Sequence, residues 1–145
     1  MAASTWQFYH SFKEYMADNT VDLDTHNFRL ALFLSTSNFA TKTLTTYSQL
    51  TNEVANANGY TTGGKALANI TWVSGRSAAE MRWDATALIF TASGGTIVNI
   101  KGAVIYQSAG KLVAYSTLTT TGNIDITDGN TLTLTMAANG IFQLA

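Results

Sequence analysis

The sequence predicts an all-β fold, a β-sandwich or jelly-roll of about seven to nine short antiparallel strands that follow one N-terminal helix. Three observations lead to this prediction. Stretches of alternating apolar and polar residues, such as TLTLTM, recur along the chain and are typical of strands with one face in a core. Turn sequences with Gly, Asn or Asp separate them at intervals of about ten residues. Threonine, which favours strands, occurs 23 times among 145 residues, and proline is absent.

The N-terminal segment, residues 1–20, is predicted to be helical and to belong to a single domain that covers residues 1–145. A chain of 145 residues is long enough for one sizeable core and short for two. The helix is expected over residues 5–17, with Ser4 or Thr5 as its N-cap. Its apolar residues recur at helical spacing, at Phe8, Phe12, Tyr15 and Met16.

The strands are predicted from alternation or from short apolar runs that turn residues enclose. Segment 28–34 alternates, so one of its faces is expected in the core. Gly102, within strand 96–106, suits a bulge or a close backbone approach. Residues 35–46 are expected to form a loop, followed by a short helical turn around residues 50–54. The other predicted strands are 66–73, 81–84, 87–92, 111–118, 124–126, 131–136 and 140–144, with a hairpin turn at 107–111 and a glycine-containing turn at 127–130.

Residues 59–66, GYTTGGKA, come close to the phosphate-binding loop of nucleotide hydrolases, G-x-x-x-x-G-K followed by Ser or Thr. That loop needs a strand before the glycines and a helix after the lysine, because the amides of a helix N-terminus hold the phosphate. Here EVANAN precedes the glycines, an alternating segment follows Lys65, and Ala66 replaces the magnesium-binding hydroxyl. The segment is therefore predicted to be a glycine-rich turn that leads into strand 66–73.

Side chains with catalytic or metal-binding chemistry are few and scattered. His10 and His26 lack the spacing of a metal-binding pair, and cysteine is absent. Asp22 and Asp24 offer at most a weak calcium site, and local hydrogen bonding in a turn is the favoured interpretation. The protein is therefore predicted to have no catalytic, metal-binding or cofactor-binding residue and not to be an enzyme. The other carboxylates considered are Glu53, Glu80, Asp84, Asp125 and Asp128.

Two groups of aromatic residues allow more than one interpretation. Trp72 and Trp83 could form a sugar-binding platform, but Trp72 shares a strand face with Ala68 and Ile70, which favours the core. The N-terminal group can pack on its own sandwich or dock on a neighbouring subunit, since aromatic anchors dominate interface energetics. These candidate interface residues are Trp6, Phe8, Tyr9 and Phe12.

The composition argues against two classes of partner. A net charge of -1 and a pI near 6.0 give no electrostatic attraction to nucleic acid or to an anionic membrane. No apolar run approaches the roughly 18 to 20 residues of a membrane span. Charged residues make up only 12% of the chain, about half the usual share. Such a surface is either covered by partner proteins or kept soluble by Thr, Ser and Asn.

Several segments, in order, resemble those of small virion proteins of tailed bacteriophages. They are FYHSFKEYM, VDLD, FRLALFLSTS, TNEVANANGYTTGGKALANITW, WDATALIF and KGAVIYQ, and together they cover nearly the whole chain. The resemblance implies a head decoration or cement subunit, a β-sandwich or jelly-roll module on the outside of the capsid. It also implies that the glycine-rich segment joins strands, and it supplies no catalytic residues.

The resemblance leads to a specific functional hypothesis. The protein is expected to be a capsid cement subunit that binds across junctions of the major capsid protein as a homodimer or homotrimer. It would lie on the outer surface of the virion, and in the host cytoplasm during assembly. One alternative is a tail-associated adaptor or receptor-binding virion protein. A second alternative, from a different class, is a carbohydrate-binding module or a small hydrolase that uses exposed aromatic residues.

Overall fold

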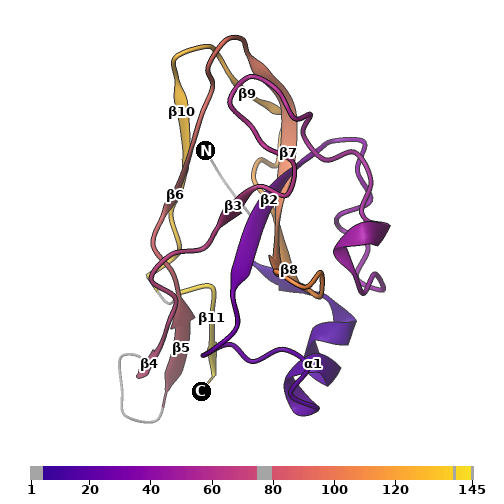
Figure 1. Ribbon diagram of the computed structural model, residues 1–145, viewed down its shortest axis with the longest axis vertical. Coiled ribbons are helices and arrows are strands. Elements are labelled where there is room, and N and C mark those ends of the chain that lie inside the picture. The colour runs from indigo at the N-terminus through magenta and orange to yellow at the C-terminus, as the bar shows by residue number, and fades with distance from the viewer. Residues whose placement is uncertain (1–4, 75–79, 139, 145) are drawn as a thin grey trace.

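The computed structural model describes residues 5–74, 80–138 and 140–144, and it confirms an all-β fold with one N-terminal helix (Figure 1). Eleven strands lie in these residues, and two of them, β1 and β3, have only two residues each. All strand pairs are antiparallel. The elements are β1 Gln7–Phe8, α1 His10–Ala17, β2 Phe28–Leu34, the 3-10 turn η1 Tyr47–Gln49, β3 Lys65–Ala66, β4 Thr71–Ser74, β5 Met81–Asp84, β6 Leu88–Thr91, β7 Ile97–Gln107, β8 Leu112–Thr117, β9 Ile124–Ile126, β10 Thr131–Leu134 and β11 Phe142–Leu144.

The strands form two layers. The larger sheet has the order β1-β8-β7-β2-β3, and β9 also pairs with β7. The opposite layer consists of two short sheets, β10-β6 and β11-β5-β4. Figure 1 shows β6, β10, β5 and β11 along one side of the molecule and β2, β7 and β8 along the other. The main core joins the layers, since Leu30 and Ile105 of the large sheet belong to the same buried cluster as Trp83, Phe90 and Leu132.

Strand β2 is buried on both faces, whereas one face in the core was predicted. Phe28, Leu30 and Leu32 point into the main core. Ala31 and Phe33 alternate with them and belong to a second buried cluster. The cause is the loop that follows β2, because Phe39 from this loop and Tyr9 from the N-terminus cover the other face. A continuous apolar run is typical of a strand covered on both sides.

The N-terminal helix is shorter than predicted and starts later. α1 begins at His10, after Gln7 and Phe8 pair with β8 as strand β1. Tyr9 occupies the N-cap position with extended backbone and without a side-chain cap, so Thr5 does not cap the helix. Ser4 lies outside the described residues. β1 pairs with the edge of β8 opposite β7, and the alternation of Trp6 and Phe8 suits a strand at that position.

The predicted strand 66–73 is split between the two layers. Lys65–Ala66 pairs with β2 in the large sheet, whereas Thr71–Ser74 pairs with β5 in the opposite layer. Between them, Asn69 has a positive φ of 50°, which breaks the extended path. Ala68 is therefore exposed instead of sharing a buried face with Trp72. The alternation predicted the strand character of both ends but not the change of layer.

The turn predictions are largely confirmed. Strands β7 and β8 form a hairpin whose turn contains Gly110. Gly102 lies under the ring of Phe39, where an added Cβ would come within 2.2 Å of the ring, so it serves a close approach. Residues 35–46 are irregular, and the short helical turn is the 3-10 turn η1, slightly earlier than expected.

Candidate functional site

The glycine-rich segment 59–66 wraps around a carboxylate of its own chain. The Gly63 amide donates a hydrogen bond of 2.7 Å to Glu53 Oε1, and the Tyr60 hydroxyl donates one of 2.6 Å to the same oxygen. The Tyr47 hydroxyl donates to the other carboxylate oxygen. In a phosphate-binding loop such an amide would hold a phosphate, whereas here it binds the carboxylate of Glu53. The predicted turn is confirmed, because a two-residue strand and not a helix follows the glycines.

Two further side chains fix the glycine-rich segment to the large sheet. Arg29 of β2 donates from Nε to the Gly63 carbonyl at 3.0 Å and from its second terminal nitrogen to the Gly64 carbonyl at 2.7 Å. The Tyr106 hydroxyl of β7 also donates to Gly63, at 2.8 Å. Lys65, the lysine of the motif, donates to the Ile89 carbonyl of β6 at 2.6 Å. These contacts assign the loop and its lysine a structural role in this chain.

Burial keeps the tyrosines around Glu53 protonated. Desolvation raises the pKa of Tyr60, and its hydrogen bond to the Glu53 carboxylate raises the pKa further. The pKa of Tyr47 is raised by the same two causes in the same order. A phenol that keeps its proton remains a donor, which is the state that Glu53 requires. At neutral pH, both tyrosines therefore keep the protons that they donate to Glu53.

Glu53→Ala is expected to lower the free energy of unfolding by about 1.5–3 kcal/mol, because it removes the acceptor of charge-assisted hydrogen bonds. Glu53→Gln keeps an acceptor oxygen and is expected to cost less. Chemical denaturation of both variants measures the difference. The double variant Glu53→Ala, Tyr60→Phe should lose less than the sum of the single losses, since both changes remove the same bond. Additive losses would contradict this network.

Stability is expected to fall above about pH 10, where the tyrosines of the unfolded chain begin to ionise. The raised pKa of Tyr60 in the folded state means that the folded protein keeps its proton at a pH where the unfolded chain loses it. This contribution is complete below the unfolded pKa and declines as the pH rises toward the folded pKa. Denaturation titrations on both sides of that pH test the expectation. Tyr60→Phe should show a shallower decline, and an identical slope would contradict the assignment.

Aspartates and a histidine outside this network serve local turns. Asp22 accepts hydrogen bonds from the amides of Asp24 and Thr25, at 2.9 and 3.2 Å, and these bonds lower its pKa. His26 Nδ1 lies 3.0 Å from the Asp22 amide and 2.7 Å from Gln107 Nε2. The structure thus confirms the favoured interpretation of Asp22, which forms local hydrogen bonds in a turn. Asp125 and Asp128 instead connect distant segments, because they accept hydrogen bonds from the amides of Asn99 and Gly94.

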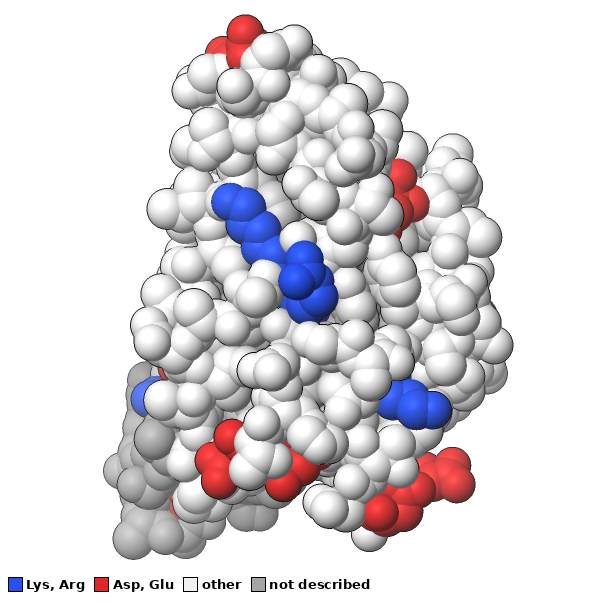
Figure 2. All heavy atoms as spheres, viewed as in Figure 1, with Lys and Arg blue, Asp and Glu red and all other residues white. Residues whose placement is uncertain are grey.

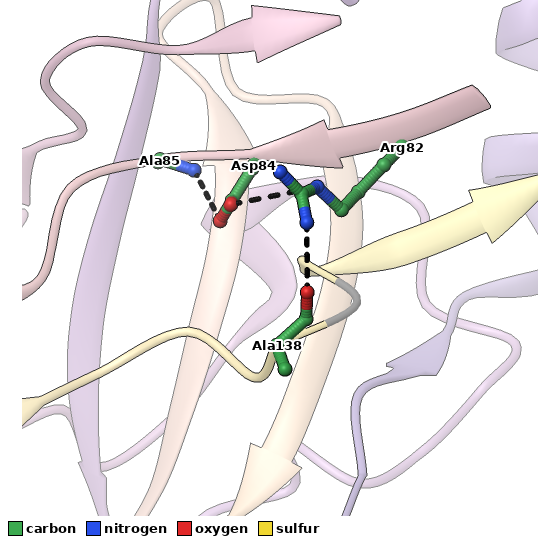
Figure 3. A network of polar contacts seen from close by, with 4 residues as sticks. All are labelled: Arg82, Asp84, Ala85 and Ala138. Carbon is green, nitrogen blue, oxygen red and sulfur yellow. Dashed lines mark hydrogen bonds and ion pairs between the residues drawn. The ribbon is translucent and has the colours of Figure 1, made fainter. Parts of the chain in front are cut away.

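Strand β5 carries the one ion pair found within the described ranges. Arg82 Nε lies 3.8 Å from Asp84 Oδ2, and Arg82 also donates to the Ala138 carbonyl at 2.8 Å. Figure 3 shows these side chains next to each other on β5, with Arg82 reaching the chain near Ala138. Asp84 Oδ1 accepts from the Ala85 amide at 2.9 Å. The group ties the connection before β11 to β5.

The two tryptophans do not form an exposed sugar-binding platform. Trp83 is fully buried, packs edge-on against Phe28 at 5.0 Å between ring centroids, and donates from its indole nitrogen to the Leu23 carbonyl. Trp72 is only partly buried and packs against the main core, with its ring 5.5 Å from that of Phe142. Trp72 also lines a small pocket of about 270 Å³ together with Asp22 and Asp24.

The N-terminal aromatic residues divide into two pairs. Tyr9 and Phe12 are 0% and 2% exposed, so they pack inside their own chain. Trp6 and Phe8 are partly buried against the main core. The interface interpretation therefore rests on Trp6 and Phe8, for which it stays a prediction. Sequence spacing could not separate the pairs, because it did not reveal the change from β1 to α1 at Tyr9.

An apolar groove lies beside Trp6. Its volume is about 630 Å³, and it opens between the end of the large sheet and the strands of the opposite layer. None of the described residues that line it is charged. The residues that shape it, called the Trp6 groove below, are Trp6, Leu118, Ile124, Leu132, Leu134 and Phe142. The sequence does not reveal this groove, because its walls come from five separate segments.

No protein-family model matches this chain, and neither does any curated protein or solved structure.

The surface is poor in charge, as the composition implied. Figure 2 shows a face on which uncharged side chains predominate and the charged ones form small, separate groups. Several charged side chains also donate hydrogen bonds to backbone carbonyls elsewhere in the chain, as Arg29, Lys65 and Lys101 do. Within the described ranges, the longest helix, α1, has eight residues, and no helix could cross a membrane. The exposed large apolar side chains there are Ile89 and Val98.

Proposed function

We propose that the protein is a structural subunit of a tailed-phage virion, a cement protein on the outer surface of the capsid. The order of segments that resembles small virion proteins supports this proposal. The observation that carries most weight is the charge-poor surface, because a protein partner that covers it has few charges to desolvate.

The outer face of β6 and β10 is the surface that we propose for the contact with the major capsid protein. Ile89 and Thr91 of β6 are exposed there, and they lie opposite Thr133 and Thr131 of β10. Ile89 is 51% exposed, although it is a large apolar side chain. Four uncharged side chains on two paired strands give a flat surface on which an apolar contact with a capsid subunit could form.

Cement action would follow from mass action. A subunit that binds only the expanded shell stabilises that shell by its binding free energy. Many sites on each particle make the total stabilisation large, even when each contact is modest. Because the proposed face is uncharged, its affinity should depend little on salt concentration.

Particles that lack the protein test the proposal. Removal of the protein or deletion of its gene should make particles release their genome at lower temperature or after osmotic shock, and added purified protein should restore them. Unchanged particle stability would contradict the cement role. For the contact face, Ile89→Lys should fail to restore the particles. Val98→Lys is the matched control, because Val98 is exposed to a similar extent, 46%, but lies on β7.

Labelling the protein on intact virions separates the head from the tail. Signal over all faces of the head agrees with a cement subunit. Signal at one vertex or along the tail would instead support the adaptor or receptor-binding alternative. The small pocket beside Trp72 and Asp22 is where the carbohydrate-binding alternative would act. A glycan array without hits disposes of that alternative, and a hit that Trp72→Ala removes would support it.

A further inference from the structure

One edge of strand β10 is unpaired within the described ranges. β10 hydrogen-bonds with β6 in a two-stranded sheet, and it has no partner on its other side among the strands of the described chain. That edge borders the Trp6 groove, which residues 132–137 line one after another. An unpaired edge presents a row of backbone donors and acceptors to which another strand can bind.

The hydrogen bonds at the start of β10 define which residues face this edge. The Ala92 amide donates to the Asn130 carbonyl, and the Gly129 amide donates to the Ala92 carbonyl. Gly129 has φ +81°, so this is the bulge that requires glycine in its first position. Antiparallel pairs then alternate, which turns the backbone groups of Leu132 toward β6 and those of Thr131 and Thr133 away from it.

Strand β6 provides an independent check of this alternation. Ile89 is the cross-strand partner of Thr133, and its carbonyl accepts a hydrogen bond from the Lys65 side chain. The Ile89 carbonyl therefore faces away from β10, as the alternation requires. Lys65 also shows how the outer edge of β6 is protected, since a lysine over an edge discourages pairing with another strand. β10 has no such protection: residues 129–145 contain no charged residue and no proline.

The sequence of this edge is a palindrome. Residues 131–135 read TLTLT in both directions, with Thr133 at the centre. In an antiparallel pair of two identical strands, a two-fold axis through Thr133 would place Thr opposite Thr and Leu opposite Leu. Thr–Thr pairs across antiparallel strands are favourable, and no like charges meet. The edge is therefore complementary to a second copy of itself.

We propose that the protein forms a dimer in which β10 pairs antiparallel with β10 of a second copy, about a two-fold axis through Thr133. The outward backbone groups of Thr131, Thr133 and Thr135 form the hydrogen bonds between the two strands. The threonine side chains lie on the exposed face of a continuous sheet, β6-β10-β10-β6. Leu132 of the partner subunit lies beside Leu134, on the side of the Trp6 groove. This inference goes beyond the proposed function, because it concerns the purified protein alone.

Site-specific cross-linking tests the register. The chain has no cysteine, so Thr133→Cys introduces a single thiol. Its counterpart lies directly across the proposed axis, and a short bismaleimide should join the two copies rapidly. Thr91→Cys is the control, because Thr91 is also exposed on the same face but lies on β6, one strand farther from the axis. Cross-linking of Thr133→Cys no faster than that of Thr91→Cys would overturn the proposed pairing.

The oligomeric state provides the second test. Sedimentation equilibrium of the wild-type protein should give twice the 15.6 kDa of one chain. Thr133→Pro removes an amide that faces away from β6, so the variant should keep the β6–β10 pairs and sediment at half the wild-type mass. A wild-type protein that stays monomeric at high concentration would contradict the inference, and so would a Thr133→Pro dimer. If Thr133→Pro does not fold, Thr133→Lys provides the same comparison, because it places like charges opposite each other.

Discussion

Replacing Trp83 by Ala is expected to lower the free energy of unfolding by about 3–5 kcal/mol, as for other large buried aromatic residues. Trp83 is fully buried at the point where the two layers meet. It packs edge-on against Phe28 of the large sheet, and its indole nitrogen donates to the Leu23 carbonyl at 3.1 Å. The variant would lose these contacts and leave a cavity that rigid strands cannot close.

Trp72→Ala is the matched control for this prediction. Trp72 is the cross-strand partner of Trp83, so both changes remove the same side chain from neighbouring positions of one sheet. Because Trp72 is only partly buried, its loss should cost clearly less. Urea denaturation of the two variants measures both losses. Equal losses, or a loss below about 1 kcal/mol for Trp83→Ala, would contradict the position of Trp83 in the core.

Gly64→Ala is expected to cost about 2–5 kcal/mol of stability. Its φ of +66° is left-handed, which costs a residue with a Cβ roughly 1–2 kcal/mol. The added Cβ would also lie 1.9 Å from the Leu30 carbonyl oxygen and 2.6 Å from the Ala31 Cα, and such overpacking typically costs about 1–3 kcal/mol. The backbone of β2 would have to move away, and the hydrogen bonds of Arg29 to this segment would weaken.

Gly94→Ala separates the cost of the left-handed backbone from the cost of steric overlap. Gly94 also has a positive φ, +81°, but an added Cβ meets no atom of the described residues within 4 Å. It should therefore show only the left-handed cost of roughly 1–2 kcal/mol. Thermal and chemical denaturation of both variants gives the comparison. Similar losses at Gly64 and Gly94 would mean that the glycine-rich segment does not pack closely on β2.

The sequence predicts strands well where the pattern and the turn residues of the segment itself define them. The pair β7 and β8 forms a hairpin, and the turn signal between them sets its register. The pattern of segment 28–34 likewise predicted the bounds of β2. Which of its faces are covered depends instead on Phe39 and Tyr9, which reach β2 from outside its own segment.

Long-range contacts explain the incorrect predictions. The apolar residues Phe8 and Phe12 suit a helix, but the edge of β8 draws the first of them into a strand. Segment 66–73 is split because its start pairs with β2 and its end pairs with β5. β2 and β5 are far from each other in the sequence and belong to different layers. Local periodicity carries no information about either choice.

The same limit applies to the candidate sites. The flanks of the glycine-rich segment correctly predicted a turn in place of a phosphate loop, but they did not reveal that Glu53 binds its amide. Glu53 lies six and seven residues from Tyr47 and Tyr60, spacings that match neither a helix nor a strand. The Trp6 groove was also missed, since residues from both chain ends form it. The palindrome of β10 is visible in the sequence, but only the unpaired edge gives it meaning.

A difference map of the virion, reconstructed with and without this protein, tests the central proposal most directly. The cement role predicts added density on the outer surface of the head, repeated over the junctions between major capsid subunits. Each added density should accommodate the two-layered sandwich with the face around Ile89 toward the shell. A map with no added density on the head, or with density only at the tail, would contradict the proposal.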